Sequence, residues 1–159
     1  MGNAFLYRMP SGIPGDVSRK SQSTIEAHPI TGSFAAYGLF GKLDTNGNFA
    51  PLGSSDTAVY GLLVRAYPVQ STTNAQGPAT PPTSGIQDVL RRGYMTVSCN
   101  AGTAKKGGTV YVRVANAAAG KPIGGIEAVA DSTNTIALTN AIFMHDADAA
   151  GNVEISYNI

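Results

Sequence analysis

The residues best placed to bind a phosphate group lie in a glycine- and lysine-rich stretch, TAKKGGTVYVRV, at residues 103–114. Gly102 and Gly107 have the spacing of the two glycines in a phosphate-binding P-loop, where a lysine must follow the second glycine. Gly108 stands at that position instead. The residues that follow alternate as a strand does, whereas a P-loop needs a helix whose N-terminus holds the anion. The stretch therefore predicts a turn that begins a strand.

Nucleophilic catalysis and zinc binding have few candidate residues. The sequence contains His28, His145 and a single cysteine, Cys99, and none of them stands in an HxxxH, HExxH or CxxC pattern. A triad of His145, Asp56 and a serine lacks the GxSxG elbow that would expose a nucleophile. Cys99 shares one face of a predicted strand with Met95 and Val97 and is therefore expected to face the core. One cysteine excludes an internal disulfide. We expect no catalytic residue, no metal site and no cofactor, and hence no enzyme.

Two acidic stretches imitate calcium-binding loops. DTNGNF, which begins at Asp44, lacks the glycine required at the sixth position. DADAAGNVEISY, which begins at Asp146, has its aspartates and glycine correctly placed, but Tyr157 stands where a bidentate glutamate is needed. Both stretches therefore predict acidic turns rather than calcium sites.

Two pairs of basic residues flank one predicted strand: Arg91 with Arg92, and Lys105 with Lys106. They could form a basic patch, but 11 Lys and Arg residues nearly balance 10 Asp and Glu residues, and no nucleic-acid recognition motif is present. We expect no nucleic-acid partner. The pairs are either solvated charges or, as we prefer, partners for carboxylates of another protein, where they would fix register more than affinity.

The composition is unusually poor in charge. Charged residues make up 13 % of the 159 residues, against roughly 25 % in soluble domains. A neutral polar surface suits a component of an assembly, because it costs less to desolvate than charge does, and it equally suits a secreted β domain. No apolar run approaches the length of a membrane span, and the N-terminus lacks a signal peptide, so we expect no membrane partner and production in a cytoplasm.

The first 23 residues are predicted to form an extended N-terminal arm. Residues 8–23 combine prolines and glycines without a helix or strand period. Apolar side chains at residues 5–9 favour an arm that lies across a neighbouring molecule, although disorder at a terminus is the alternative. Phe5, Tyr7 and Arg8 are the predicted anchors, since aromatic residues and arginine dominate interface hot spots.

Residues 24–159 are predicted to form one β domain, whose first half contains several strands. Pro29 would interrupt a central ladder and so indicates either an edge strand or a bulge at residues 24–30. Asn46-Gly47 predicts a hairpin with a type I′ turn. A strand is predicted within residues 56–69, with a possible short helical turn at 53–57. Residues 70–85 then form a long loop rich in Pro, Thr and Ser.

The second half of the chain predicts further strands separated by Gly, Asn and Pro turns. They are expected within residues 86–102, 110–118, 124–131, 135–148 and 151–159. In VYVRV the valines share one face, and Tyr111 and Arg113 share the other. Without a convincing helix period, the chain is predicted to be all-β, a single β-sandwich or β-barrel.

Five segments, taken in order, resemble the structural cement or capsid decoration proteins of tailed bacteriophages. They are AFLYRMPSGIPGDVSRK, DTAVYGLLVRAYPVQ, TPPTSGIQDVLRRGYMTV, GGTVYVRVANAAAGKPIGG and GNVEISYNI. The resemblance implies a non-enzymatic protein on the capsid exterior of the virion, assembled in the bacterial host cytoplasm. It further implies that the protein bridges neighbouring subunits of the phage major capsid protein and that it needs no cofactor.

The resemblance and the residues together predict a staple with several modest contacts. The chain is also expected to associate with itself as a dimer or a trimer; closed symmetry suits either, and no motif selects between them. The predicted partner contacts are Phe5, Tyr7, Arg8, Arg19, Lys20, Arg91, Arg92, Lys105 and Lys106.

Two other classes of function stay open at this point. A carbohydrate-binding or adhesin-like β module would use exposed aromatic residues such as Tyr37, Tyr60 or Tyr111 as stacking platforms. A small hydrolase would need a cleft containing a histidine with a perturbed pKa, and the sequence around neither histidine predicts one.

Overall fold

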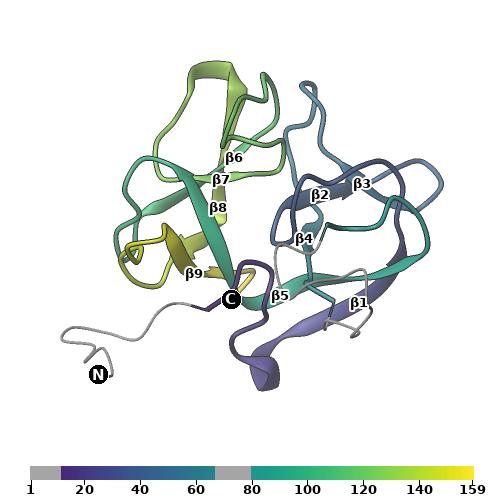
Figure 1. Ribbon diagram of the computed structural model, residues 1–159, viewed down its shortest axis with the longest axis horizontal. Coiled ribbons are helices and arrows are strands. Elements are labelled where there is room, and N and C mark those ends of the chain that lie inside the picture. The colour runs from purple at the N-terminus through teal and green to yellow at the C-terminus, as the bar shows by residue number, and fades with distance from the viewer. Residues whose placement is uncertain (1–11, 67–79) are drawn as a thin grey trace.

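The computed structural model describes residues 12–66 and 80–159 and confirms an all-β fold (Figure 1). The strands are β1 (Thr24–Pro29), β2 (Phe40–Leu43), β3 (Phe49–Pro51), β4 (Gly61–Leu63), β5 (Ile86–Ala101), β6 (Thr109–Arg113), β7 (Ile126–Glu127), β8 (Thr135–Phe143) and β9 (Asn152–Tyr157). Two single 3-10 turns, η1 (Lys20–Gln22) and η2 (Ser132–Asn134), accompany them. No helix among these residues is long and apolar enough to cross a membrane.

The long strand β5 belongs to two sheets. Its first half pairs with β1 and β4, which gives an open sheet in the order β3-β2-β4-β5-β1. Its second half pairs with β7 and β9, and the sequence β5-β7-β6-β8-β9 returns to β5. This ring is a closed barrel, so of the two predicted architectures the barrel is the one observed. Figure 1 shows the barrel on the left and the open sheet on the right.

Gly93 marks the point where β5 passes from the open sheet into the barrel. Its φ of +133° is one that residues with a side chain rarely adopt. A Cβ atom at this position would lie 2.2 Å from Ser23 Oγ and 2.8 Å from Ser23 Cα. Only glycine therefore permits this close approach of the chain before β1 to the bend in β5.

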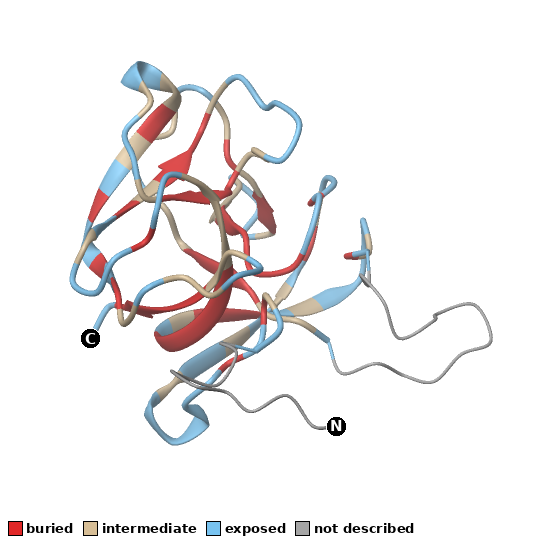
Figure 2. Ribbon diagram, turned by 60° about the vertical axis from the view of Figure 1, so that its left-hand side comes forward, coloured by how far each residue is buried: buried red, intermediate tan, exposed pale blue. Residues whose placement is uncertain are grey.

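The apolar core has two parts. The larger part fills the barrel and continues under the open sheet through Phe40, Leu62 and Leu90. The smaller part covers the opposite face of the open sheet, where the Phe34 and Phe49 rings stack with centroids 5.2 Å apart. In Figure 2 the buried residues concentrate in the barrel wall and where the barrel meets the sheet. Residues 93–97 of β5 are all buried, because the barrel core covers one face and the segment before β1, with Gly12 against Thr96 and Arg19 over Tyr94, covers the other.

The predicted hairpin at Asn46-Gly47 joins β2 to β3, but its turn is not type I′. Gly47 has a φ of +81°, whereas Asn46 is not among the residues with positive φ. The Asp44 carboxylate accepts the N–H groups of Asn46 and Asn48, each at 2.8 Å. The loop therefore has three residues, of which one, Gly47, is left-handed, whereas a type I′ turn needs two residues with positive φ. Here the hydrogen bonds to the Asp44 carboxylate stabilise the loop.

The strand predicted within residues 56–69 is shorter than expected. Regular pairing covers Gly61–Leu63, which pair with β2 on one side and β5 on the other, and residues 67–69 lie outside the described residues. The preceding turn is not helical, since the Asp56 carboxylate closes it by accepting the Gly53 N–H at 2.6 Å. Of the predicted loop, residues 80–85 lead irregularly into β5, and residues 70–79 lie outside the described residues.

Residues 12–23 of the predicted arm are packed against the barrel. Gly15 N–H donates to the Thr96 carbonyl at 2.8 Å, Thr96 N–H donates to the Asp16 carbonyl at 2.9 Å, and Val17 is buried. Backbone pairing of this kind needs no side-chain period, which is why the sequence did not reveal it. Residues 12–23, which were expected to be extended rather than packed, thus lie against the barrel through a single bridge at Val17 and the turn η1.

Candidate functional site

The predicted partner contacts occupy different places on the molecule. Phe5, Tyr7 and Arg8 lie outside the described residues. Four cations surround the bend in β5, namely Arg19, Lys20, Arg91 and Arg92. Lys105 and Lys106 lie in the turn before β6, at the other end of the barrel half of β5. The two basic pairs therefore do not form one continuous patch.

Arg19 is already engaged within the chain. Its Nη2 lies 2.8 Å from Glu154 Oε2, and its Nε donates to Glu154 Oε1 at 3.1 Å. The guanidinium also stacks over the Tyr94 ring, 4.2 Å from the centroid. Burial raises the pKa of Glu154, but hydrogen bonds from Arg19 and Ser18 outweigh it, so the pKa is lower than usual. The pair fastens residues 18–19 to β9.

Arg91 joins the open sheet to the barrel. Its guanidinium lies 3.6 Å from the Tyr60 ring centroid, and its Nη1 donates to the Tyr60 carbonyl. The Tyr157 hydroxyl of β9 donates to the same carbonyl at 3.2 Å. Arg91 Nε also lies 3.5 Å from Glu26 Oε2. Its main contacts are thus internal, like those of Arg19.

Glu26 collects several donors on one carboxylate oxygen. The Tyr60 hydroxyl donates to Oε2 at 2.7 Å, and His28 Nε2 lies 3.2 Å from the same oxygen. The hydrogen bonds from Tyr60 and His28 lower the pKa of Glu26. The predicted strand with Pro29 is therefore confirmed as an outer strand whose polar face is bound to the residues before β4.

Lys105 forms an exposed ion pair, in which its Nζ lies 2.7 Å from Asp146 Oδ2. The Asp146 carboxylate also accepts the Lys106 backbone N–H at 3.1 Å. The turn closes through a hydrogen bond from Gly108 N–H to the Lys105 carbonyl, which confirms that this stretch is a turn before a strand.

Arg92 and Lys106 are the predicted cations whose charged groups remain available. Arg92 is exposed beside the bend, and Lys106 is exposed in the turn before β6. Within residues 12–66 and 80–159 neither side chain has an ion-pair partner. They are therefore the residues of this set that can meet carboxylates of another molecule without first breaking an internal pair.

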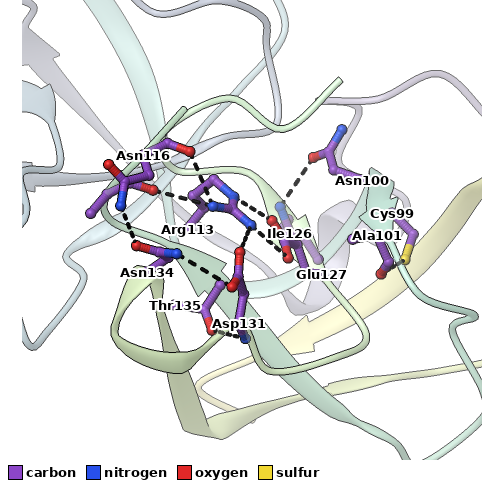
Figure 3. Close-up of polar contacts among 11 residues, drawn as sticks. Cys99, Asn100, Ala101, Arg113, Asn116, Ile126, Glu127, Asp131, Asn134 and Thr135 are labelled. Carbon is purple, nitrogen blue, oxygen red and sulfur yellow. Dashed lines mark hydrogen bonds and ion pairs between the residues drawn. The ribbon is translucent and has the colours of Figure 1, made fainter. Parts of the chain in front are cut away.

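A buried ionic cluster around Arg113 was not predicted from the sequence (Figure 3). The arginine side chain is 2 % exposed, and its Nε donates to the fully buried Glu127 at 2.6 Å. Its Nη2 donates to Asp131 at 2.6 Å, and its Nη1 donates to the Ala115 and Asn116 carbonyls, each at 3.2 Å. The hydrogen bond to Glu127 raises the pKa of Arg113, and the hydrogen bond from Arg113 lowers the pKa of Asp131.

This cluster holds the loops at one end of the barrel in place. Asn116 Nδ2 donates to Asn134 at 2.6 Å, and Asp131 N–H donates to the Thr135 hydroxyl at 2.9 Å. The loops cover the face of β6 that strand alternation assigns to solvent, so Arg113 is not on an outer face. A glutamate within the otherwise apolar stretch GGIEAV was the one signal of a buried partner.

Cys99 and His145, the residues considered for catalysis, both contact other parts of the fold. Cys99 is half-buried, and burial raises the pKa of its thiol, which disfavours the reactive thiolate. His145 Nε2 accepts the Glu154 N–H at 3.3 Å. Among the residues that the structure describes, no three His, Cys, Asp or Glu side chains are grouped to hold a metal ion.

The proposed sugar-stacking platforms are mostly covered. Tyr37 is 6 % exposed. Tyr60 carries Arg91 on its ring, and Tyr111 is half-buried within β6. A carbohydrate-binding module gains no support from these three side chains.

Comparison with known proteins identifies the family. The model of the family described as "XM1 gp53 minor capsid protein" matches residues 2–157. A search of curated proteins finds no match. A solved structure, "The capsid of Myoviridae Phage XM1", contains a chain with the same fold, with a TM-score of 0.71 and 23 % identity over 99 % of this chain and 97 % of that chain. The resemblance to phage capsid-associated proteins is confirmed, and the chain belongs to the XM1 gp53 minor capsid protein family.

Proposed function

We propose that this structural virion protein is a cement protein, which binds the outside of a phage capsid and bridges neighbouring major capsid subunits without catalysing a reaction. The observation that supports it most strongly is the family match over nearly the whole chain. The fold is also shared with a chain of a phage capsid.

The arrangement of the two sheets suits a bridging role. A bridge needs at least two contact surfaces that are held in a fixed relation. The barrel and the open sheet share β5, and the larger core is continuous between them. Arg92 lies at the bend and Lys106 at the far end of the barrel, so the two available cations can meet different subunits.

The distribution of charge suits contacts that are mostly neutral. Arg19, Arg91, Lys105 and Arg113 are paired with carboxylates of the same chain. A surface of Ser, Thr, Asn and Gly can hydrogen-bond to a shell at low desolvation cost, and the remaining cations would fix register. In a lattice each further contact becomes intramolecular, so modest contacts add up to stable attachment.

Sedimentation with expanded phage heads that lack this protein tests the proposal. We expect saturable binding in a fixed ratio to the major capsid protein, together with greater resistance of the heads to heat. Arg92→Gln and Lys106→Gln should weaken binding most at low salt, because exposed charges are screened by ions. Thr139→Glu changes the net charge by the same amount at an exposed position of β8 and should bind like the unmodified chain. Failure of the unmodified chain to bind the heads would refute the proposal.

A further inference from the structure

The loop between β2 and β3 contains the one asparagine in the sequence that is followed by a glycine, Asn46 before Gly47. The backbone nitrogen of the residue after an asparagine can attack the side-chain amide carbon and close a five-membered succinimide ring. A side chain on that residue hinders the attack, and glycine has none. Every other asparagine of the chain is followed by a residue with a side chain. The sequence therefore singles out Asn46 for this reaction.

The surroundings of the Asn46 side chain leave it free to turn. Asn46 and Gly47 are both exposed. The hydrogen bond at Asn46 comes from its backbone N–H, and among the described residues no group binds its side-chain amide. A Cβ atom built on Gly47 would meet no atom within 4 Å, so the space beside the attacking residue is open. The amide carbon can thus approach the Gly47 nitrogen without losing a contact of its own.

The other asparagines that the structure describes are restrained. Asn48, two residues further on, donates from Nδ2 to Asp44 Oδ2 at 3.0 Å, and the residue after it, Phe49, is buried. Rotation of such a side chain toward the following nitrogen would break its hydrogen bond. Side-chain hydrogen bonds of this kind are made by Asn48, Asn100, Asn116, Asn134, Asn140, Asn152 and Asn158.

One hydrogen bond opposes the reaction at Asn46. The Gly47 N–H donates to the Asp44 carbonyl at 3.1 Å, and the nitrogen must leave this acceptor before it can attack. The loop is an exposed hairpin end, where single hydrogen bonds open frequently at small cost. We expect the attack in the folded chain to be about tenfold slower than in the unfolded chain.

The geometry points to Asn46 as a site of spontaneous covalent modification by deamidation. The Gly47 nitrogen forms a bond to Asn46 Cγ, the bond from Cγ to the side-chain nitrogen breaks, and ammonia leaves with the proton from the Gly47 N–H. Water then opens the succinimide at either carbonyl and gives aspartate or isoaspartate. The reaction consumes one water and needs no oxidant or cofactor. It goes beyond the proposed function, because it is a property of the chain without phage heads.

Either product weakens the hairpin. Aspartate at position 46 places a second carboxylate close to Asp44, and like charges repel. Isoaspartate adds one carbon to the main chain between Asn46 and Asn48, whose N–H groups both donate to Asp44 Oδ1 at 2.8 Å. The next residue is Phe49, which pairs with Leu43 and belongs to the smaller part of the core. Loosening of the loop therefore reaches the packed end of β3.

Incubation in water labelled with oxygen-18 tests the site. The purified, full-length chain is kept in mildly alkaline labelled water, digested in ordinary water and analysed by tandem mass spectrometry. Opening of the succinimide during incubation adds the heavy oxygen, which separates this product from deamidation during digestion. We expect heavy product at Asn46 and at least about tenfold less at Asn48, because Phe49 hinders attack where Gly47 does not. Labelling by an isoaspartyl methyltransferase identifies the isoaspartate fraction.

Two references complete the experiment: the chain unfolded in urea, and the variant Asn46→Ser, which has no side-chain amide at this position. The melting temperature of the unmodified chain should fall during incubation, whereas that of Asn46→Ser should stay constant. Heavy product at Asn46 in urea but not in the folded chain, or equal amounts at Asn46 and Asn48 in the folded chain, would overturn the assignment. A constant melting temperature after complete modification would overturn the effect on the hairpin. Since no heads are present, these results are separate from the test of head binding.

Discussion

The guanidinium of Arg19 and the carboxylate of Glu154 form an ion pair with two hydrogen bonds, which joins the segment before β1 to the last strand of the barrel. Arg19 is one of the predicted partner contacts, and within the chain its charge is paired with Glu154. The Glu154 side chain is 11 % exposed and that of Arg19 is 44 % exposed, so the pair is shielded mainly on the carboxylate side.

Replacing Glu154 with glutamine should destabilise the fold by about 1 to 2 kcal/mol, because three donors lose a charged acceptor in a partly buried site. Urea unfolding followed by circular dichroism measures the change. Lys105→Met is the matched control, since it removes an exposed ion pair whose side chains are 68 % and 49 % exposed. The control should change stability by less than about 0.5 kcal/mol. Equal effects of the two variants would show that the Glu154 pair does not hold the segment.

Acid should destabilise the chain through the same carboxylate. The pKa of Glu154 is lowered in the folded chain, so its stabilising contribution is fully present above the pKa of the unfolded state. The contribution is lost as the pH falls from about 4.3, the ordinary glutamate value, through the lower folded value. The pKa of Glu26 is shifted in the same direction, by hydrogen bonds from Tyr60 and His28, so protonation of Glu26 removes stability in the same range. Melting temperatures measured from pH 6 to pH 3 should fall less steeply for Glu154→Gln than for the unmodified chain.

The buried pair of Arg113 and Glu127 should respond differently to single and double substitutions. Glu127→Gln or Arg113→Met leaves one charge without its buried partner and should cost about 3 to 5 kcal/mol. The double variant Arg113→Met with Glu127→Leu removes both charges and should lose less than the sum of the single losses. Urea unfolding of the three variants measures this coupling. Strictly additive losses would contradict a direct interaction between the two side chains.

The sequence predicted those features of the fold that depend on local pattern. The alternation in residues 86–102 corresponds to β5, and Pro29 correctly indicated an outer strand. Alternation could not show that β5 serves two sheets, because the division at Gly93 depends on the approach of Ser23 from a distant turn. Closure of the barrel likewise depends on pairing between β5 and β9, which are far apart in sequence.

The candidate site was predictable by residue type but not by environment. Arginines and lysines at the bend and the turn were recognisable, yet the sequence could not show that Glu26, Asp146 and Glu154 engage three of them. Arg113 was misplaced because alternation assumes that one face of a strand meets solvent. In this barrel, loops that follow β6 and β7 cover that face.

Gly93→Ala should be among the most damaging single-methyl substitutions in the described chain. The new Cβ would meet Ser23 at both Oγ and Cα, and the backbone conformation itself is strained for alanine. Gly85→Ala provides the matched control, since Gly85 has a φ of +95° and a methyl carbon added there would meet no atom within 4 Å. We expect a loss of about 1 kcal/mol for Gly85→Ala and at least twice that for Gly93→Ala, measured by thermal unfolding. Because the bend sets the angle between barrel and sheet, any folded Gly93→Ala protein should also bind phage heads less tightly than Gly85→Ala protein. Equal stability and equal head binding of the two variants would show that the approach of Ser23 does not set the bend.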